Sequence, residues 1–425
     1  MTELLAPAGD LEKLKIALMY GADAVFIGGQ DFSLRARASN FTIEDIKEAT
    51  KFAHERHKKV YVTTNIIPHH EDMHDLLTYL KALEEAKVDA IIAASPYIIE
   101  TALKHTQLEV HLSTQQSATN SEVVNFWHEQ GIKRVVLARE LDKTQIRALI
   151  PKTKADIEVF IHGGMCMSYS GRCSLSNNMT DRDANRGGCA HSCRWNYDLI
   201  RDGEKVSDQS FSMSSKDLEA LEQIPYLMDS GVSSLKIEGR MKSLHYIATV
   251  VSTYRRLMDD YLLYGQIEDF SFYAKELEKA ENRLASHGYL EGMPGVEQQL
   301  YNMRSERPTQ LFIGLVQDYD PETSIAIIEQ RNHFTEGEFV EIFHPDGRVE
   351  FCVIENMTDI DNAPLDVARH PKQLIKIKVP FPVEPYAMLR KRWDILLKMA
   401  KSSPIKSFEK ETSTPIFVSK KAFFT

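Results

Sequence analysis

Four of the five cysteines in this 425-residue chain lie close together, in the order Cys166-x6-Cys173-x15-Cys189-x3-Cys193. Four thiolates complete the coordination of a zinc ion or of a 4Fe–4S cluster. Structural zinc sites usually arrange their cysteines in two tight pairs, and only the second pair is tight here. Unrelated structural cysteines would rarely cluster in this way. The segment therefore predicts a metal site, with an iron–sulfur cluster favoured over zinc.

The residues around these cysteines carry positive charge and aromatic rings. Between residues 162 and 201, five arginines outnumber three aspartates, which gives +2 in a chain whose net charge is -10. Tyr169, Trp195 and Tyr197 lie in the same segment. Arginine beside aromatic rings suits a splayed nucleotide, because the phosphate needs charge and the base needs a stacking surface. A solvated loop with incidental charges explains these residues equally well, and the acidic chain as a whole counts mildly against nucleic acid.

A second set of polar residues follows the predicted strands, and several of them are cationic. Arginine grips a carboxylate or phosphate with two parallel hydrogen bonds, so cations converging on one site would bind an anionic small molecule. The candidate substrate-binding residues are Arg35, Arg37, Asn65, Ser113, Gln115, Arg139 and Glu140.

The candidate catalytic residues are His162, Lys236, Glu238 and Arg240. The alternation Lys236-x-Glu238-x-Arg240 directs three side chains to one side of a strand. They either act on a substrate or form an inward layer of ion pairs, and their position at a strand end favours the first role. His162 precedes Cys166 by four residues and would ligate the metal, move protons or cap the strand. The sequence contains no Gly-x-Ser-x-Gly, His-Glu-x-x-His or P-loop motif, so serine-triad and zinc-protease chemistry find no support.

Short β-branched runs alternate with helical patterns through residues 1–305. The predicted strands are 4–6, 24–27, 59–63, 90–93, 109–112, 134–137, 157–161 and 234–237. Strict alternation of strands and helices implies a parallel sheet, and eight such units fit a (β/α)8 TIM-like barrel. An open doubly wound sheet is the alternative. We favour the barrel because polar residues follow nearly every strand, and in a barrel all these ends meet at one mouth.

One connection in the predicted barrel is much longer than the others. It follows the seventh strand, spans residues 162–231, and holds all four clustered cysteines. Long insertions in compact domains are often functional. The sequence therefore predicts that the metal site lies in an insertion at the mouth of the barrel, where active sites of this fold are found.

The character of the sequence changes after the barrel. Residues 272–286 read as a charged helix, and residues 306–395 predict a small β-barrel domain with turn signals such as Pro345-Asp346-Gly347. Its predicted strands are 311–316, 325–329, 339–343, 349–354 and 375–379. The polar tail, residues 396–425, is expected to be loosely ordered.

The sequence indicates a cytoplasmic protein without membrane contact. No apolar run approaches the ~20 residues that a membrane span needs. Residues 1–7 lack the basic and apolar stretches of a signal peptide. In the cytoplasm clustered cysteines bind metal more often than they form disulfides. Cys352 stands apart in an apolar stretch and reads as a small buried hydrophobic residue.

Four segments resemble peptidase family U32, the collagenase-like peptidases. They are LLAPAG at residues 4–9, HLSTQ at 111–115, EVFIHGGMCMSYSGRCSLS at 158–176 and SLKIEGR at 234–240. The resemblance covers the barrel and the C-terminal β domain. It implies RNA or quinone hydroxylation rather than peptide cleavage, and a 4Fe–4S cluster held by Cys166, Cys173, Cys189 and Cys193.

Within that family the chain is most similar to the branch that modifies tRNA. This similarity implies synthesis of 5-hydroxyuridine at the wobble position, contact with the anticodon region, and dependence on prephenate as a cosubstrate or ligand. Prephenate is a dicarboxylate, which agrees with a cationic mouth. An electron donor is a possible further partner. Two alternative functions are a metal-dependent peptidase and a non-catalytic RNA-binding protein whose fold is stabilised by a metal.

Overall fold

The computed structural model describes residues 2–34, 40–208, 210–281, 283–300 and 308–392. Parallel strands close into a barrel, because β11 pairs with both β1 and β7 while the other strands pair in chain order. This confirms the predicted TIM-like fold. The strands are β1 (Glu3–Pro7), β2 (Ala24–Gly28), β3 (Lys59–Thr64), β4 (Ala90–Ala93), β5 (Glu109–Leu112), β6 (Arg134–Val136), β7 (Asp156–Gly163) and β11 (Ser234–Ile237).

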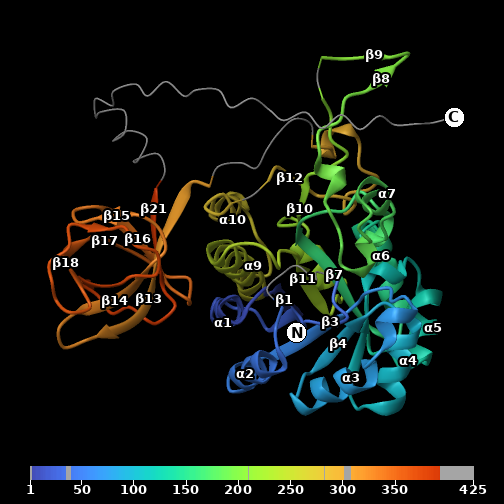
Figure 1. Ribbon diagram of the computed structural model, residues 1–425, viewed down its shortest axis with the longest axis horizontal. Coiled ribbons are helices and arrows are strands. Elements are labelled where there is room, and N and C mark those ends of the chain that lie inside the picture. Colours follow the sequence, from blue (N-terminus) through green and yellow to red (C-terminus); the bar gives the residue numbers. More distant parts are fainter. Residues whose placement is uncertain (1, 35–39, 209, 282, 301–307, 393–425) are drawn as a thin grey trace.

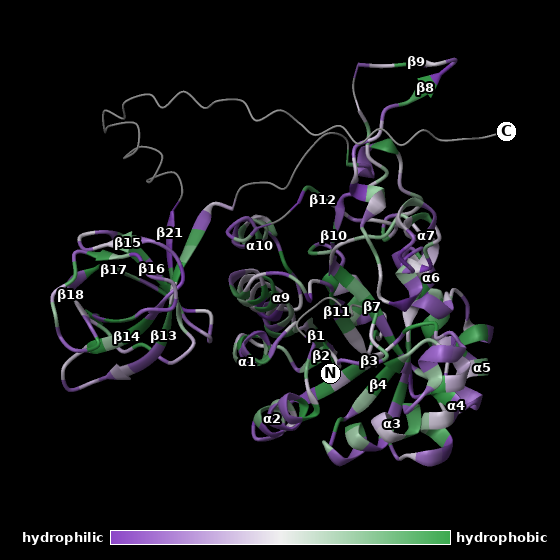
Figure 2. Ribbon diagram, in the orientation of Figure 1, coloured by the Kyte–Doolittle hydropathy of each residue, from purple (hydrophilic) through white to green (hydrophobic). Residues whose placement is uncertain are grey.

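Helices surround this barrel, and the core lies between them and the strands (Figure 1). The strands are buried on both faces, as expected of a covered parallel sheet, and Figure 2 shows them as the most hydrophobic part of the barrel. The helices are α1 (Leu11–Met19), α2 (Ile43–His54), α3 (Leu76–Glu85), α4 (Pro96–His105), α5 (Ser121–Glu129), α6 (Lys143–Leu149), α8 (Ile224–Asp229) and α9 (Leu244–Tyr264). In the part of the chain that the structure describes, no helix is both long and apolar enough to cross a membrane.

The cysteine-bearing insertion lies between β7 and β11, as predicted. It contains α7 (Leu175–Thr180), a projecting hairpin of β8 (Ile200–Arg201) and β9 (Glu204–Lys205), and β10 (Asp217–Glu219). The last of these pairs antiparallel with the end of β7. The insertion is thereby tied to the sheet immediately before the chain enters the last barrel unit.

The charged helix predicted for residues 272–286 is shorter than expected. The structure has α10 (Ser271–Leu277), and β12 (Ala285–Ser286) then pairs parallel with β10. The backbone amide of Asp217 donates to the carbonyl of Leu284 at 3.0 Å. This segment therefore bonds to the base of the insertion, which competes with continuation of the helix.

The C-terminal domain is an antiparallel half-barrel with its own apolar core. Its main strands are β13 (Gln310–Asp320), β14 (Ile325–Gln330), β16 (Phe339–Phe343), β17 (Val349–Val353), β18 (Glu355–Asp359), β20 (Leu374–Lys378) and β21 (Met388–Arg392), and β15 (Phe334–Thr335) pairs separately with β19 (Val367–Ala368). The prediction missed β18 and β21. The sequence of β21, MLRKR, reads as a polar segment, yet Arg390 is fully buried beside Glu341.

The C-terminal domain lies beside α1 and α9 (Figure 1). Tyr20, at the end of α1, is buried at this interface, with its hydroxyl 3.0 Å from the carbonyl of Phe343 and 2.9 Å from that of Tyr386. The rings of His245 and Phe312 stack at 5.9 Å in the same interface. The two domains are thus joined by specific buried polar contacts as well as by packing.

The interior of the barrel holds a layer of ion pairs. The fully buried carboxylate of Glu158 accepts from Lys236 Nζ at 2.6 Å and from Arg134 at 3.4 Å. Arg134 also donates to Glu3 at 2.6 Å, and the Tyr61 hydroxyl donates to Glu3 at 2.7 Å. Two carboxylates and two cations therefore compensate one another, which buried charges require.

Replacing Tyr20 with Phe should lower the free energy of unfolding by about 1–2 kcal/mol, because the carbonyl oxygens of Phe343 and Tyr386 lose the hydroxyl that donates to them. Urea unfolding measures this loss. The matched control is Tyr79→Phe, since the Tyr79 hydroxyl is buried and has no hydrogen-bond partner among the described residues. Equal effects of the two substitutions would contradict the role assigned to Tyr20.

Replacing Glu158 with Gln should destabilise the protein by about 3–5 kcal/mol near neutral pH, because the substitution leaves buried cations without their charge partner. Burial alone would raise the pKa of Glu158, but Lys236 and Arg134 outweigh burial and hold that pKa below its usual value. The stabilisation is therefore complete above the ordinary carboxyl pKa of about 4.3 and is lost as the pH falls through the folded-state value.

Unfolding free energies measured by urea between neutral and acidic pH test this expectation. The curves of the wild type and of Glu158→Gln should converge on acidification. Glu322→Gln, at an exposed position, is the control and should follow the wild type throughout. A constant gap between the wild-type and Glu158→Gln curves would show that the pair does not titrate as argued.

Candidate active site at the barrel mouth

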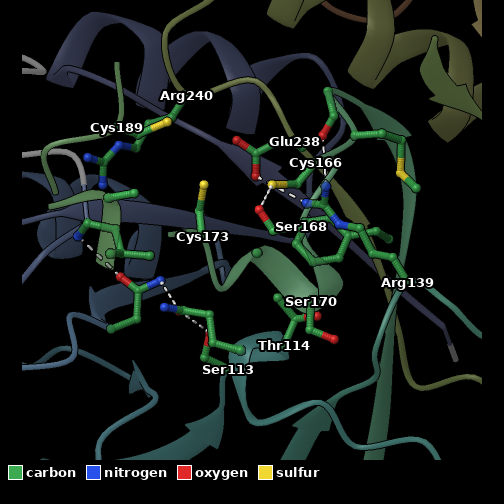
Figure 3. Close-up of a pocket in the computed structure, with 18 of the residues that line it drawn as sticks. Ser113, Thr114, Arg139, Cys166, Ser168, Ser170, Cys173, Cys189, Glu238 and Arg240 are labelled. Atoms are coloured by element: carbon green, nitrogen blue, oxygen red, sulfur yellow. Dashed lines mark hydrogen bonds and ion pairs between the residues drawn. The ribbon is translucent and has the colours of Figure 1, made fainter. Parts of the chain in front are cut away.

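A cavity of about 370 Å³ opens at the carboxyl ends of the barrel strands. Side chains of the barrel and of the insertion line it together (Figure 3). All four clustered cysteines and eight of the eleven other candidate residues contribute to its wall. The site predicted at the mouth and the predicted metal site are therefore one site.

Short turns hold the cysteine segment in shape. The side chain of Asn185 accepts from the amide of Cys173 at 3.3 Å and donates to its carbonyl at 3.0 Å. The buried hydroxyl of Ser176 accepts from the amide of Ala190 at 3.0 Å, next to Cys189. Because side chains satisfy these backbone groups, the segment keeps a defined path without long helices or strands.

Two further contacts fix the segment to barrel loops. Arg186 donates two hydrogen bonds of 2.6 Å to the carboxylate of Asp72, in the loop between β3 and α3. On the other side, Glu140 accepts from the amide of Ser170 at 2.7 Å. Two-pronged arginine–carboxylate contacts define orientation as well as distance. The cysteines are thus attached to loops that follow two different strands.

The four thiols lie near enough to affect one another. Burial raises the pKa of Cys193, the charges of Cys166, Cys189 and Cys173 raise it further, and Arg194 opposes them. Cys166, Cys173 and Cys189 surround the upper part of the cavity in Figure 3. A bound metal centre would favour the thiolate forms and relieve their repulsion. The donor set of four thiols on one wall therefore fits a thiolate-ligated centre.

The barrel side of the cavity contains a deeply placed cation. Arg240 is only 4% exposed, and its guanidinium donates to the hydroxyls of Ser33 at 3.0 Å and Thr63 at 3.3 Å. It also donates to the side chain of Asn40 at 3.4 Å. These contacts orient the guanidinium in the wall of the cavity. Arg240 is therefore placed where it can donate to an anion that enters.

A neutral hydrogen-bonding group lies on the wall formed after β3 and β5. The Gln115 carbonyl oxygen accepts from Asn65 at 3.2 Å and from Ser113 at 2.9 Å. The amide nitrogen of Gln115 is buried and has no hydrogen-bond partner among the residues that the structure describes. A buried donor without a partner costs free energy, so this nitrogen is available to a ligand oxygen.

Arg139 is held in place by three different contacts. It donates to the carbonyl of Gly164 at 2.7 Å, lies 3.7 Å from the Glu238 carboxylate, and stacks on the ring of Phe160 at 3.8 Å. A stacked and hydrogen-bonded guanidinium loses little further entropy on binding an anion. Arg139 is thus preorganised at the junction of barrel and insertion.

The Lys236-x-Glu238-x-Arg240 alternation brings all three residues to the lining of the cavity. Lys236 at the same time belongs to the ion layer, because it pairs with Glu158 and lies over the rings of Phe26 and Phe160. It therefore forms the floor of the cavity, whereas Arg240 stands in its wall.

The side chain of His162 does not lie in the cavity with the other candidate residues. It is 4% exposed, lies 3.2 Å from the Tyr254 hydroxyl, and does not line the cavity. Burial, with a contribution from Lys242, lowers the pKa of His162 to about 3, so the ring is neutral at physiological pH. The side chain of His162 therefore packs against α9 and does not face the cysteines.

A bulge in β7 explains this placement. Lys236 pairs with Phe160, but the next residue, Ile237, pairs with His162, so Ile161 is an extra residue on β7. An extra residue reverses which face of the sheet the following side chains occupy. Without the bulge, His162 would point inward with Glu158 and Phe160. The sequence contains no visible signal for this shift.

Arg35 and Arg37 lie outside the described residues. The remaining candidates, Asn65, Ser113, Gln115, Arg139, Glu140, Lys236, Glu238 and Arg240, all line the cavity. Sequence reasoning missed the residues that support them, above all Glu158, Phe160, Ser33 and Thr63. Glu158 and Phe160 alternate along a predicted strand, and this period would have identified them as inward-facing.

The chain was compared with known proteins. Residues 9–300 match peptidase family U32, and residues 308–390 match the C-terminal domain of the same family. The chain is 50% identical over 400 residues to tRNA hydroxylation protein P1 of Bacillus subtilis (strain 168), covering 92% of this chain and 94% of the relative. It is 31% identical over 444 residues to tRNA hydroxylation protein P of Escherichia coli (strain K12), covering 92% and 97%.

A further relative modifies a different RNA according to its name. The chain is 41% identical over 258 residues to the 23S rRNA 5-hydroxycytidine C2501 synthase of Escherichia coli (strain K12), covering 60% of this chain and 39% of the relative. The matches extend over both the barrel and the half-barrel, and they confirm the resemblance found in the sequence. The chain belongs to peptidase family U32.

Proposed function

We propose that this protein hydroxylates the wobble uridine of tRNA to 5-hydroxyuridine in the cytoplasm. The observation that carries the proposal is that four cysteines and a preorganised set of cations line one cavity at the mouth of the barrel. The relatives named as tRNA hydroxylation proteins support the substrate class, since they match nearly the whole chain. A uridine base that leaves its stack in the anticodon loop would enter this cavity.

We propose Cys166, Cys173, Cys189 and Cys193 as the ligands of a 4Fe–4S cluster. When bound, such a cluster supplies one-electron redox chemistry, and an electron donor would then be a partner. Zinc is the less favoured metal, because only the second of the two cysteine pairs has the tight spacing usual in zinc sites. In either case the insertion holds the thiols at the mouth through Arg186, Asn185 and Glu140.

We further propose that prephenate binds deeper in the cavity than the RNA base. Prephenate carries two carboxylates, and Arg240 and Arg139 offer guanidinium groups held on opposite sides of the cavity (Figure 3). The amide nitrogen of Gln115 offers a donor to a further ligand oxygen. The hydrogen bonds that arginine donates to a carboxylate are charge-assisted and are about twice as strong as those between neutral groups.

Nucleoside mass spectrometry of tRNA tests the proposed reaction. In cells without another route to 5-hydroxyuridine, the gene carrying Cys189→Ala should reduce this nucleoside by about tenfold or more, because the metal centre loses a ligand. Cys352→Ala is the matched control, since Cys352 is buried in the C-terminal domain and should leave the nucleoside level unchanged. An unchanged level in Cys189→Ala would sink the proposal.

The same preparations separate the alternative functions. Cleavage of gelatin by the purified protein, abolished by a chelator, would favour a metal-dependent peptidase. tRNA binding without any hydroxylation would favour a non-catalytic RNA-binding protein. Measurement of iron and sulfide distinguishes the cluster from zinc. The purification must be anaerobic, because exposed thiols oxidise in air.

Replacing Arg240 with Gln should raise the KM for prephenate by about 10–100-fold, because a charge-assisted hydrogen bond contributes about 1.5–3 kcal/mol. Steady-state kinetics with saturating tRNA measures this change. Arg348→Gln is the control, because Arg348 is exposed on the C-terminal domain and pairs there with Asp346. An unchanged KM in Arg240→Gln would remove Arg240 from the prephenate site.

A further inference from the structure

A second group of cations lies at the rim of the cavity, around Gly164. Arg194 follows Cys193 in the insertion, Lys242 lies between β11 and α9, and Arg283 lies between α10 and β12. Three segments that are distant in sequence thus bring positive side chains to one place. Only Arg194 belongs to the arginine-rich segment of residues 162–201; Lys242 and Arg283 come from other parts of the chain.

The geometry around Gly164 shows how closely these cations approach. A Cβ atom on this residue would lie 3.2 Å from Nη2 of Arg194 and 3.5 Å from Nη2 of Arg283. On the other side, the Gly164 carbonyl accepts from Arg139 at 2.7 Å. Three guanidinium groups therefore meet around a residue without a side chain. A Cβ atom here would press on the Arg194 guanidinium and touch that of Arg283.

Carboxylates lie among these cations as well. Asp217 is buried and lies 3.0 Å from Arg283, and Glu238 lies 3.7 Å from Arg139. Lys242 donates to the carbonyl of Glu281 at 3.2 Å and lies over the Tyr246 ring. Arg194 is exposed and Lys242 is half-buried, so both side chains can reach a ligand at the rim.

Charges from several segments act on Lys242. Burial is the main cause that lowers the pKa of Lys242; Asp217 and Glu281 oppose burial, whereas Arg283 and Arg194 reinforce it. Like charges held this close repel one another, and an anion between them would relieve the repulsion. The chain as a whole carries -10, so it attracts a polyanion only through local groups such as this one.

We propose that Arg194, Lys242 and Arg283 bind the backbone phosphate of a nucleotide next to the one whose base enters the cavity. This inference rests on the proposed function. Arg194 lines the cavity itself, so a phosphate held there lies beside the opening. Trp195, which is 42% exposed, follows directly and offers a face on which a neighbouring base can stack. RNA bound in this way places phosphates on the rim and one base inside.

The same side chains would otherwise serve only to tie the insertion to the barrel. The two roles differ in how tRNA binding depends on salt. Each cation that neutralises a phosphate releases bound counterions, so its removal lowers the slope of log affinity against log salt by about 0.7–0.9. An ion-pair network inside the protein has no such effect on the slope.

The experiment measures tRNA binding by fluorescence anisotropy over a series of salt concentrations, with Arg194→Gln and Lys242→Gln. These positions leave the buried Arg283–Asp217 pair intact, and thermal unfolding verifies that the variants are folded. We expect severalfold weaker binding and a slope reduced by about one unit for each variant, to the same extent for tRNAs of different sequence. Arg348→Gln, on the C-terminal domain, is the matched control and should keep the wild-type slope.

Wild-type slopes in both folded variants would overturn the inference while leaving the proposed function intact. A raised KM for prephenate with an unchanged tRNA slope would also overturn it, because the anion bound at the rim would then be the cosubstrate. If the wild-type protein itself shows no salt-dependent binding of tRNA, both this inference and the proposed RNA substrate fail.

Discussion

The contact between Glu158 and Lys236 is the constraint on which the mouth of the barrel depends. The two groups lie 2.6 Å apart in the interior and join β7 to β11, where the sheet closes. The first of these strands leads into the cysteine-bearing insertion, and the second leads to Glu238 and Arg240. A buried pair of this kind adds little net stability over apolar packing, but loss of one partner is costly. It therefore fixes the relative position of the two strands that carry the site.

The same pair divides the barrel interior into two parts. Below it, Arg134, Glu3 and Tyr61 complete a polar layer whose charges cancel. Above it, Phe26 and Phe160 flank Lys236, and the cavity begins. Lys236 is already matched by Glu158, whereas Arg240 and Arg139 present their guanidinium groups from the barrel to the cavity. The ligand-binding groups are thus separate from the group that holds the strands together.

Much of this architecture could be predicted from local sequence patterns. The strands at residues 90–93, 109–112 and 234–237 were predicted with the observed bounds, because short apolar runs ended by polar residues define buried parallel strands. The predicted mouth also gathers most of the candidate residues, since strand ends in a barrel meet on one side. These successes rest on periods that repeat along the chain.

The failures have a different physical origin. The bulge at Ile161 turns His162 outward, and it depends on how β7 pairs with β11 rather than on the residues themselves. The strand β21 contains Arg390 and Lys391, whose charges are matched by Glu341 and Glu338 from β16 and the turn before it. A polar segment can be recognised as a central strand only when the residues that pair with its charges are known. Contacts between distant segments, and not local preference, decided both cases.

The positive groups of the mouth occupy two environments, and the difference limits what each can bind. Arg240 is 4% exposed and donates to the hydroxyl of Ser33, so an anion that reaches it must leave water almost completely. Such a site suits a small ligand whose oxygens are all satisfied by the protein. Lys242 and Arg194 remain in contact with solvent and can meet a phosphate that keeps part of its hydration. Gly164 and Arg139 separate the two environments, so a deep small anion and an outer polyanion can be held at once without competing for the same side chains.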